Sequence, residues 1–214
     1  MLRNKNLFIT FEGIEGSGKS YQSQKLYKTL KRLRYPVIKT REPGGTKNAE
    51  AIRNIILSGS KNKFTKVTDT LLYLAARNEH IEKILKPAIF KKKYIICDRF
   101  VDSTIAYQVY GKNVSRALID SVHKVILKNI KPDITFILKL NIKKAFKRIK
   151  KRKHLNRYDK FSMKFYQKVQ NAFIKIAKNN PKYVIIDTSL NDNKAENIIY
   201  KKFLSYSKYD KKKS

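Results

Sequence analysis

The sequence lacks the features that mark secreted and membrane-spanning proteins. It contains a single cysteine, Cys97, so no disulfide can form within the chain. Cys97 ends the apolar run Tyr-Ile-Ile-Cys, and we interpret it as a small buried residue without a redox role. No window approaches about eighteen apolar residues, and the first residues reach a charge before any apolar run as long as that of a signal peptide. These absences predict a cytoplasmic protein that has no membrane partner.

Acidic residues are also scarce: the chain has 16 Asp and Glu against 50 Lys and Arg, and a formal net charge of +34. Of the basic residues, 39 are Lys and 11 are Arg, and the lysines are spread over almost every segment. This distribution favours coding bias with a solvated surface over a nucleic-acid-binding platform, so nucleic acid is not expected as a partner. The lysine-rich residues 208–214 are predicted to form a disordered tail.

No change of composition and no Pro/Ser-rich stretch divides the 214 residues, which predicts one domain over residues 1–214. Short apolar runs predict strands at 7–11, 36–40, 94–97, 133–140 and 183–186. Helical periodicity predicts helices at 19–34, 47–58, 67–90, 101–110, 115–129, from 141, and 192–206, with one more carrying Phe161, Phe165, Val169 and Phe173. Apolar strands that alternate with helices indicate an α/β protein with a five-stranded parallel sheet covered on both faces.

Glycine is scarce too, and five of the seven glycines fall at positions 13, 16, 18, 44 and 45. The segment Gly13-Ile-Glu-Gly-Ser-Gly-Lys-Ser20 fits G-x-x-x-x-G-K-[ST] and lies between a predicted strand and a predicted helix. Such a loop turns its backbone N–H groups around phosphate oxygens. We expect Lys19 to reach the β- and γ-phosphates of ATP and Ser20 to bind Mg²⁺. The predicted ATP-binding residues of the loop are Gly13, Ile14, Glu15, Gly16, Ser17, Gly18, Lys19 and Ser20.

Charged residues follow two of the other predicted strands. Arg41 and Arg99 lie just beyond strand ends, where open parallel sheets bind their ligands. Two guanidinium groups suit a phosphomonoester dianion, because arginine offers planar bidentate donors and stays charged. Either arginine alone could be an ordinary surface residue. Asp98, at the end of an apolar strand, is placed to support Mg²⁺ directly or through water.

The chain resembles bacterial thymidylate kinases through Arg41-Glu-Pro-Gly-Gly-Thr46, which follows the second predicted strand. The resemblance extends over nearly the whole chain, with further matches in L-L-Y-L-A-A-R at 71–77, D-R-F at 98–100, S-T-x-A-Y-Q at 103–108, K-P-D at 131–133 and L-N-R-Y-D at 155–159. It implies the three-layer P-loop kinase fold with a short basic lid at about 147–160, and a homodimer. It also implies transfer of the γ-phosphoryl group of ATP to dTMP, giving dTDP and ADP for dTTP biosynthesis.

The resemblance implies roles for residues around the dTMP phosphate and base. Arg99 and Arg41 would hold the phosphate, and Glu15 would meet the nucleotide near its 3′-hydroxyl and phosphate. Tyr73 would stack on thymine, and Arg77, four residues on along one helix face, would hydrogen-bond a base carbonyl. Without the resemblance, Tyr73 could be a core residue and Arg77 could pair with Glu42 or Glu79.

Three further residues are placed near dTMP by the same resemblance. Thr104, Tyr107 and Gln108 would approach the edge of the base and the sugar. The ring of Tyr107 would lie where a ribose 2′-hydroxyl would collide, which favours deoxyribose. By periodicity alone, Tyr107 would be a buried helix residue.

Phosphoryl transfer needs positive charge on the migrating group. Some thymidylate kinases place an arginine in the phosphate loop for this purpose, but this chain has Gly16 at that position. The resemblance to the bacterial variant assigns the role to Arg152 in the lid. Lys19 and Arg99 are the other predicted catalytic residues, and Arg148 is a predicted ATP-binding residue, although it could belong to a solvated basic helix. Family members commonly have Asp where this chain has Asn156, which leaves the partner of Arg157 open.

Two other functions are compatible with parts of the sequence. Another P-loop deoxynucleotide or deoxynucleoside kinase would share the fold, although Arg-Glu-Pro-Gly-Gly-Thr argues against it. A basic nucleic-acid-binding protein could use the phosphate loop as a switch, but the chain lacks the interleaved aromatic and basic residues of stacking platforms. The choice between dTMP and dUMP stays open, because one methyl group contributes only about 1–3 kcal/mol.

Overall fold

The computed structural model describes residues 6–189 and 192–211. In this part of the chain, five parallel strands form one sheet. The strands are β1 (Phe8–Glu12), β2 (Val37–Arg41), β3 (Tyr94–Asp98), β4 (Ile134–Lys139) and β5 (Tyr183–Asp187). Their order across the sheet is β2-β3-β1-β4-β5, so β1 is central and pairs with β3 and β4. The predicted five-stranded parallel sheet is confirmed.

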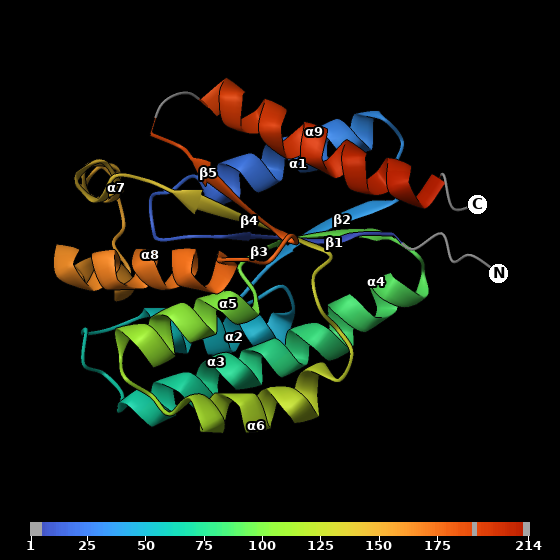
Figure 1. The fold of residues 1–214 in the computed structure, drawn as a ribbon. Coiled ribbons are helices and arrows are strands. Elements are labelled where there is room, and N and C mark those ends of the chain that lie inside the picture. Colours follow the sequence, from blue (N-terminus) through green and yellow to red (C-terminus); the bar gives the residue numbers. More distant parts are fainter. Residues whose placement is uncertain (1–5, 190–191, 212–214) are drawn as a thin grey trace.

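Helices cover both faces of the sheet (Figure 1). The helices α1 (Lys19–Arg32) and α9 (Asp192–Lys211) lie over one face, where Leu30 and Phe203 pack against Phe11 and Phe136 of the central strands. On the other side lie α3 (Lys66–His80), α4 (Lys86–Phe90), α5 (Val101–Thr104) and α8 (Met163–Ala177). The remaining helices are α2 (Lys47–Leu57), α6 (Arg116–Leu127) and α7 (Ile142–Lys150). The predicted three layers are therefore present, and β1 is buried along its whole length.

Two of the predicted helices contain a π-helical segment. The segment predicted at 67–90 forms α3, then the π-helix η1 (Ile81–Leu85), then α4. The segment predicted at 101–110 forms α5 and the π-helix η2 (Ile105–Gly111). Apolar periodicity does not distinguish these wider turns from an α-helix, and such turns are frequent at functional sites. Here η2 carries Tyr107 and Gln108, two of the predicted site residues.

The start of α8 and the end of α9 differ from the sequence prediction. Phe161 lies before α8 and directly after the short 3₁₀-helix η3 (Tyr158–Lys160). The helix begins after Ser162 because the Ser162 side chain accepts a hydrogen bond from the main-chain N of Phe165 at 3.2 Å and caps the first turn. At its other end α9 continues to Lys211, so residues 208–211 of the predicted disordered tail are helical. Residues 212–214 of that tail lie outside the described residues.

The described residues bear on two points of the sequence analysis, membrane-spanning helices and the single cysteine. No helix in residues 6–189 or 192–211 is both long and apolar enough to cross a membrane. Cys97 is fully buried in β3, as predicted, and burial raises the pKa of its thiol well above the usual value. A buried thiol with a raised pKa is a poor nucleophile, which agrees with a packing role.

Candidate functional site

The glycine-rich loop connects β1 to α1, as its motif predicts. Gly13, Gly16 and Gly18 have φ values of 138°, 76° and 93°, which residues with a side chain rarely adopt. A Cβ added at Gly13 would lie only 2.5 Å from the main-chain oxygen of Leu138 in β4. Because a strand backbone cannot move aside, this position requires glycine.

Lys19 begins α1, and its side chain turns back over the loop. Its Nζ donates to the main-chain oxygen of Ile14 at 2.6 Å and to Ser17 Oγ at 3.5 Å. Burial, followed by the positive charge of Arg99, lowers the pKa of Lys19 to about 7. A bound polyanion would favour the charged form, so this ammonium group suits a phosphate ligand.

Asp98 ends β3 beside the first turn of α1. Ser20 Oγ donates to Asp98 Oδ2 at 2.5 Å, and Asp98 Oδ1 is buried without a hydrogen-bond partner among the described residues. A buried carboxylate oxygen without a donor, next to a hydroxyl and to the phosphate loop, fits the oxygen ligands that Mg²⁺ prefers. The described residues hold no group of three or more His, Cys, Asp or Glu side chains that could bind a metal by themselves. Bound phosphates would therefore have to complete such a site.

Arg99 follows Asp98 and links the loop to the opposite side of the site. Its φ of 73° places it in the left-handed region, where the backbone of any residue other than glycine is strained. The guanidinium donates to the main-chain oxygen of Gly13 at 2.9 Å, to Ser103 Oγ at 3.1 Å and to Glu15 Oε1 at 2.9 Å. The strained backbone is thus held by contacts on three sides.

Glu15 lies inside the loop and has two partners from outside it. Tyr107 donates its hydroxyl proton to Glu15 Oε2, and Arg99 pairs with Oε1. Burial alone would raise the pKa of Glu15, but Arg99 and Lys19 outweigh it, and the pKa is lowered. Glu15 is therefore ionised at neutral pH, although it belongs to a phosphate-binding loop.

Glu12 was not predicted, yet it holds the segment that follows Arg99. Its carboxylate accepts hydrogen bonds from the main-chain N of Phe100 at 2.7 Å and from Ser103 Oγ at 2.5 Å. Burial, with the nearby charge of Asp102, raises the pKa of Glu12 to about 8. The position of Glu12 at a strand end, directly before the glycine-rich loop, is the sequence signal that could have identified it.

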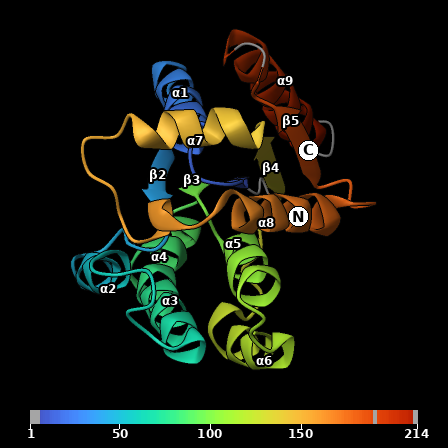
Figure 2. The ribbon, with the colours of Figure 1, turned by 90° about the vertical axis from the view of Figure 1, so that its left-hand side faces the viewer.

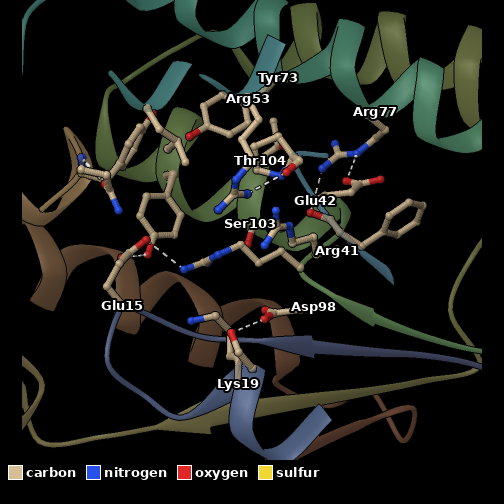
Figure 3. A pocket seen from close by; sticks show the side chains of 18 of the residues that line it. Glu15, Lys19, Arg41, Glu42, Arg53, Tyr73, Arg77, Asp98, Ser103 and Thr104 are labelled. Carbon is tan, nitrogen blue, oxygen red and sulfur yellow. Dashed lines mark hydrogen bonds and ion pairs between the residues drawn. The ribbon is translucent and has the colours of Figure 1, made fainter. Parts of the chain in front are cut away.

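Tyr73 and Arg77 project from α3 toward the same space as Glu42 (Figure 3). Arg77 is buried; its Nε donates to Glu42 Oε2 at 2.7 Å and its Nη2 to the main-chain oxygen of Phe100 at 2.8 Å. Its Nη1 lies 2.7 Å from Nε2 of His123, a residue that was not predicted. Of the two acidic partners that the sequence left open for Arg77, the structure has Glu42.

Thr104, Tyr107 and Gln108 line the same cavity from α5 and η2. Gln108 Nε2 donates to the hydroxyl of Tyr158 at 3.3 Å. The ring of Tyr158 lies edge-on to Tyr73 and Tyr107, with centroid distances of 5.9 and 5.8 Å. Tyr158 belongs to the motif at 155–159 but was not predicted as a site residue, and it completes an aromatic wall.

Arg41 and Arg53 both line the cavity, and both lie within ion-pair distance of Glu50, at 3.0 and 3.9 Å. Arg41 is more than half exposed and is paired with Glu50, whose two carboxylate oxygens each lie 3.0 Å from Arg41 Nη2. Arg53 has a side-chain exposure of 25% and donates from Nη1 to the main-chain oxygen of Pro43 at 2.7 Å. Arg53 was not predicted, although it is one of only eleven arginines in a chain that favours lysine, which is a signal that could have identified it.

Two arginines of the lid lie beside the phosphate loop and the cavity. Arg148 Nη1 donates to the main-chain oxygen of Gly16 at 3.1 Å. Arg152 lines the cavity, and its Nη1 donates to Asp159 Oδ1 at 2.7 Å. The structure therefore brings the predicted catalytic and ATP-binding arginines of the lid to the predicted site.

The third lid arginine, Arg157, is buried and pairs with Asp69 of α3, which answers the question of its partner. Asp69 also accepts hydrogen bonds from Lys112 Nζ at 2.5 Å and from the Tyr158 hydroxyl at 2.7 Å. Asn156 caps the short helix η3: its Oδ1 accepts a hydrogen bond from the main-chain N of Tyr158 at 2.8 Å. An amide oxygen can cap a helix as a carboxylate does, so Asn is compatible with the lid at this position.

One cavity of about 190 Å³ joins these groups. The predicted residues that line it are Glu15, Lys19, Ser20, Arg41, Tyr73, Arg77, Asp98, Arg99, Thr104, Tyr107, Gln108 and Arg152. The other lining residues are Glu42, Pro43, Arg53, Leu57, Phe100, Ser103, Asn156 and Tyr158. The remaining predicted residues form the adjoining loop or contact it: Gly13, Ile14, Gly16, Ser17, Gly18 and Arg148. Figure 3 shows Lys19 and Asp98 at one side of this space and Tyr73, Arg77 and Glu42 at the other.

Residues 11–199 match the profile of the family described as thymidylate kinase. The thymidylate kinase of Mycoplasma capricolum subsp. capricolum is 39% identical over 211 residues, which cover 97% of this chain and 99% of that protein. The thymidylate kinase of Wolbachia pipientis wMel is 43% identical over 202 residues, which cover 92% of this chain and 99% of that protein. The crystal structure of thymidylate kinase from Ehrlichia chaffeensis superposes with a TM-score of 0.76 at 36% identity, covering 93% of this chain and 99% of that chain.

The buried cluster around Asp69 predicts a large effect on stability. Asp69→Asn would leave the buried Arg157 and the partly buried Lys112 without their anionic partner, and we expect the free energy of unfolding to fall by about 3–5 kcal/mol. Asp120→Asn, which breaks an exposed pair with Arg116, is the matched control and should cost at most about 1 kcal/mol. Urea unfolding at neutral pH measures both values.

The pH dependence of the same variants has a defined sign. In the folded protein burial would raise the pKa of Asp69, but Lys112 and its hydrogen-bonded partners outweigh it, and the pKa is lowered. The stabilisation is therefore present above the unfolded pKa of about 3.9 and is lost as the pH falls through the folded pKa. The difference between wild type and Asp69→Asn should shrink in acid. Equal stability of the two Asn variants at neutral pH would refute this account.

Proposed function

The chain belongs to the thymidylate kinase family, and from this premise we propose how its cavity performs the reaction of that family. The enzyme transfers the γ-phosphoryl group of ATP to dTMP and releases dTDP and ADP. One observation carries the assignment of the site: the glycine-rich loop, Arg99, and the pair Tyr73 and Arg77 border a single cavity. Donor and acceptor phosphates can therefore meet there.

Arg99 and Arg53 are the residues that we assign to the phosphate of dTMP. Arg99 lies between the loop and the acceptor side, and a phosphate dianion would share its guanidinium with Gly13 and Glu15. The resemblance favoured Arg41 as the second arginine, but its donors are directed at Glu50. Arg53 lines the same cavity; its Nη1 donates to the main-chain oxygen of Pro43, and its Nε lies 3.9 Å from Glu50 Oε2. Glu50 therefore holds Arg53 less closely than Arg41, which favours Arg53 for the phosphate. Arg41, through Glu50, then helps to hold the loop after β2, because Glu50 also accepts from the main-chain N of Gly45.

The base and sugar of dTMP are assigned to the far end of the cavity. Tyr73 offers an aromatic ring for stacking on thymine, and Arg77 presents N–H donors to a base carbonyl. Thr104 and Gln108 flank the edge of the base from α5 and η2. Tyr107 is held by its hydrogen bond to Glu15. With dTMP bound as proposed, its ring would lie where a ribose 2′-hydroxyl would collide, which would favour deoxyribose.

ATP is assigned to the loop of residues 13–20, with its phosphates on the backbone N–H groups and on Lys19. Ser20 and Asp98 would hold Mg²⁺, because they offer a hydroxyl and a buried carboxylate oxygen without a donor. Mg²⁺ bound there would neutralise charge on the β- and γ-phosphates. Arg148, at Gly16, would lie against the nucleotide from the lid side. We propose a cytoplasmic location for the enzyme, because the proposed reaction takes two soluble nucleotides as substrates.

The transfer itself requires alignment and positive charge. The phosphate oxygen of dTMP is already an anion and needs no strong general base, so in-line attack on the γ-phosphorus proceeds without a covalent enzyme intermediate. Arg152 would supply charge to the migrating group, and Asp159 holds its guanidinium at the cavity until then. Closure of the lid over both nucleotides would exclude water and suppress hydrolysis of ATP.

The role of Arg152 predicts a loss of turnover on substitution. In a coupled assay of ADP release, Arg152→Ala should lower kcat by at least about 10³-fold, because transition-state charge loses its partner. Arg116→Ala, on the exposed face of α6, should leave kcat unchanged. Near-full turnover of Arg152→Ala would remove the assignment.

The same assay across nucleoside monophosphates and nucleosides distinguishes the competing functions. Faster use of thymidine or dCMP than of dTMP would indicate another kinase of this fold. Salt-sensitive DNA binding with no ADP release from ATP and dTMP would indicate the nucleic-acid-binding alternative.

The choice between Arg53 and Arg41 predicts unequal effects of two variants. Arg53→Ala should raise the KM for dTMP by roughly tenfold or more, because a charge-assisted contact to phosphate is lost. Arg41→Ala should raise it less, since its guanidinium is paired with Glu50. Initial-rate kinetics at saturating ATP measure both. A larger effect of Arg41→Ala would return the phosphate role to Arg41.

We infer that the protein is a homodimer, and an exposed apolar stripe supports this inference. Val67, Leu71 and Ala75 recur at four-residue intervals on α3, so they share one face, and Val67 and Leu71 are 48% and 46% exposed. Ile55, on the neighbouring helix α2, is 47% exposed. The two helices lie side by side at one edge of the molecule (Figure 2). Pairing of this stripe with its copy would bury it on both protomers.

The interface predicts a change of mass for one of two matched variants. Leu71→Glu should convert a dimer to a monomer, because it places a charge on the stripe. Leu33→Glu, at an equally exposed leucine beside α1, should stay dimeric. Light scattering coupled to size-exclusion chromatography measures the mass. A monomeric wild type, or a dimeric Leu71→Glu, would contradict the proposed interface.

A further inference from the structure

His123 lies on α6 behind Arg77 and is not among the residues that line the cavity. It is 6% exposed, and its Nε2 is 2.7 Å from Arg77 Nη1. The contact joins two helices whose residues are 46 positions apart in the sequence. A buried histidine in hydrogen-bond contact with a residue of the site, but outside the cavity, can affect that residue without touching a ligand.

The guanidinium of Arg77 is held on three sides. Nε donates to Glu42, Nη2 donates to the main-chain oxygen of Phe100, and Nη1 faces His123. A guanidinium has five N–H groups, so two are left for the cavity that Arg77 lines. If only Glu42 and Phe100 held Arg77, its Nη1 would have no buried acceptor. The plane of the guanidinium could then rotate toward the Glu42 carboxylate.

The chemistry of the contact determines the state of His123. Arginine only donates, so Nε2 of His123 must accept, and the imidazole must carry its proton on Nδ1. Burial, followed by the charge of Arg77, lowers the pKa of His123 to about 3, and Arg116 acts in the same direction, while Glu42 and Asp120 oppose it. The imidazole is therefore neutral throughout the physiological range.

A neutral acceptor differs from a second carboxylate at this place. Arg77 and Glu42 already balance one another, since their ion pair is buried and close. Another carboxylate would give the cluster a net negative charge beside a cavity that must admit a phosphate dianion. Imidazole satisfies the buried donor without adding charge.

We propose that His123 is a positioning residue for dTMP recognition. It fixes the plane of the Arg77 guanidinium so that the two remaining N–H groups of Arg77 face a carbonyl of the base. The proposal rests on the assignment of Arg77 to the thymine base. It predicts an effect on dTMP binding with little effect on ATP or on the transfer step.

Four variants test the proposal by steady-state kinetics. His123→Leu removes the acceptor at similar volume, and the KM for dTMP should rise roughly tenfold, with kcat and the KM for ATP within about twofold of wild type. His123→Gln retains an acceptor and should bring the KM for dTMP back to within about threefold of wild type. Ile119→Val, a buried change on the same helix, controls for loss of packing and should leave every constant unchanged.

The fourth variant separates the two assignments. Arg77→Lys should raise the KM for dTMP, because lysine cannot present two planar donors. If it does not, the role of Arg77 is wrong and the proposal for His123 fails with it. If Arg77→Lys raises the KM for dTMP and His123→Leu does not, only the proposal for His123 is overturned. The same holds if His123→Leu changes kcat and the KM for ATP as much as the KM for dTMP.

A further test measures the wild-type protein itself, and a variant serves only to assign the signal. In ¹⁵N-histidine NMR spectra, assigned with His123→Gln, the His123 ring should show an unprotonated Nε2 and a protonated Nδ1 from about pH 5 to about pH 8. The pattern should persist when dTMP is added. A protonated Nε2, or an imidazolium at neutral pH, would overturn the proposal.

Discussion

The parallel pairing of β1 with β3 is the constraint on which the site depends. Their register places Phe11 opposite Asp98, so the phosphate loop and Arg99 leave the sheet at the same edge and side by side. Two short contacts then join the strand ends: Ser20 to Asp98, and Arg99 to the main-chain oxygen of Gly13. A slip of one residue would turn the side chain of Asp98 to the other face of the sheet and separate it from Ser20 and the glycine-rich loop.

Acidic residues are scarce in this chain, and several of the buried ones join elements of the structure through ion pairs. The chain has only 16, yet Glu15, Glu42, Asp69 and Asp159 each pair with a basic residue of the site or lid. Because an unpaired buried charge is costly, each pair ties two elements together in one geometry. The excess of lysine lies elsewhere, mostly at the surface, and does not enter the cavity apart from Lys19.

The segment at 147–160 contacts both α3 and the cavity. Arg157 is anchored to α3 through Asp69, a few residues from Tyr73 on the same helix. Arg152, five residues earlier, lines the cavity and is paired with Asp159. The pair of Arg157 and Asp69 therefore ties this segment to α3, while Arg152 of the same segment stays at the cavity.

The sequence by itself determined the features that depend on neighbouring residues. The glycine-rich loop, the five apolar strands and the helix faces were predicted because turn geometry and periodicity are local properties. The resemblance to thymidylate kinases supplied Tyr73, Arg77, Thr104, Tyr107, Gln108 and Arg152, which line the cavity, but not Arg53 or Tyr158, which line it too. Only the tertiary structure showed that Glu50 pairs more closely with Arg41 than with Arg53, and that both arginines line the cavity. It also decided that Asp69 is the partner of Arg157, and that His123 stands behind Arg77. These contacts join residues distant in the chain, and no local pattern encodes which buried donor will meet which acceptor.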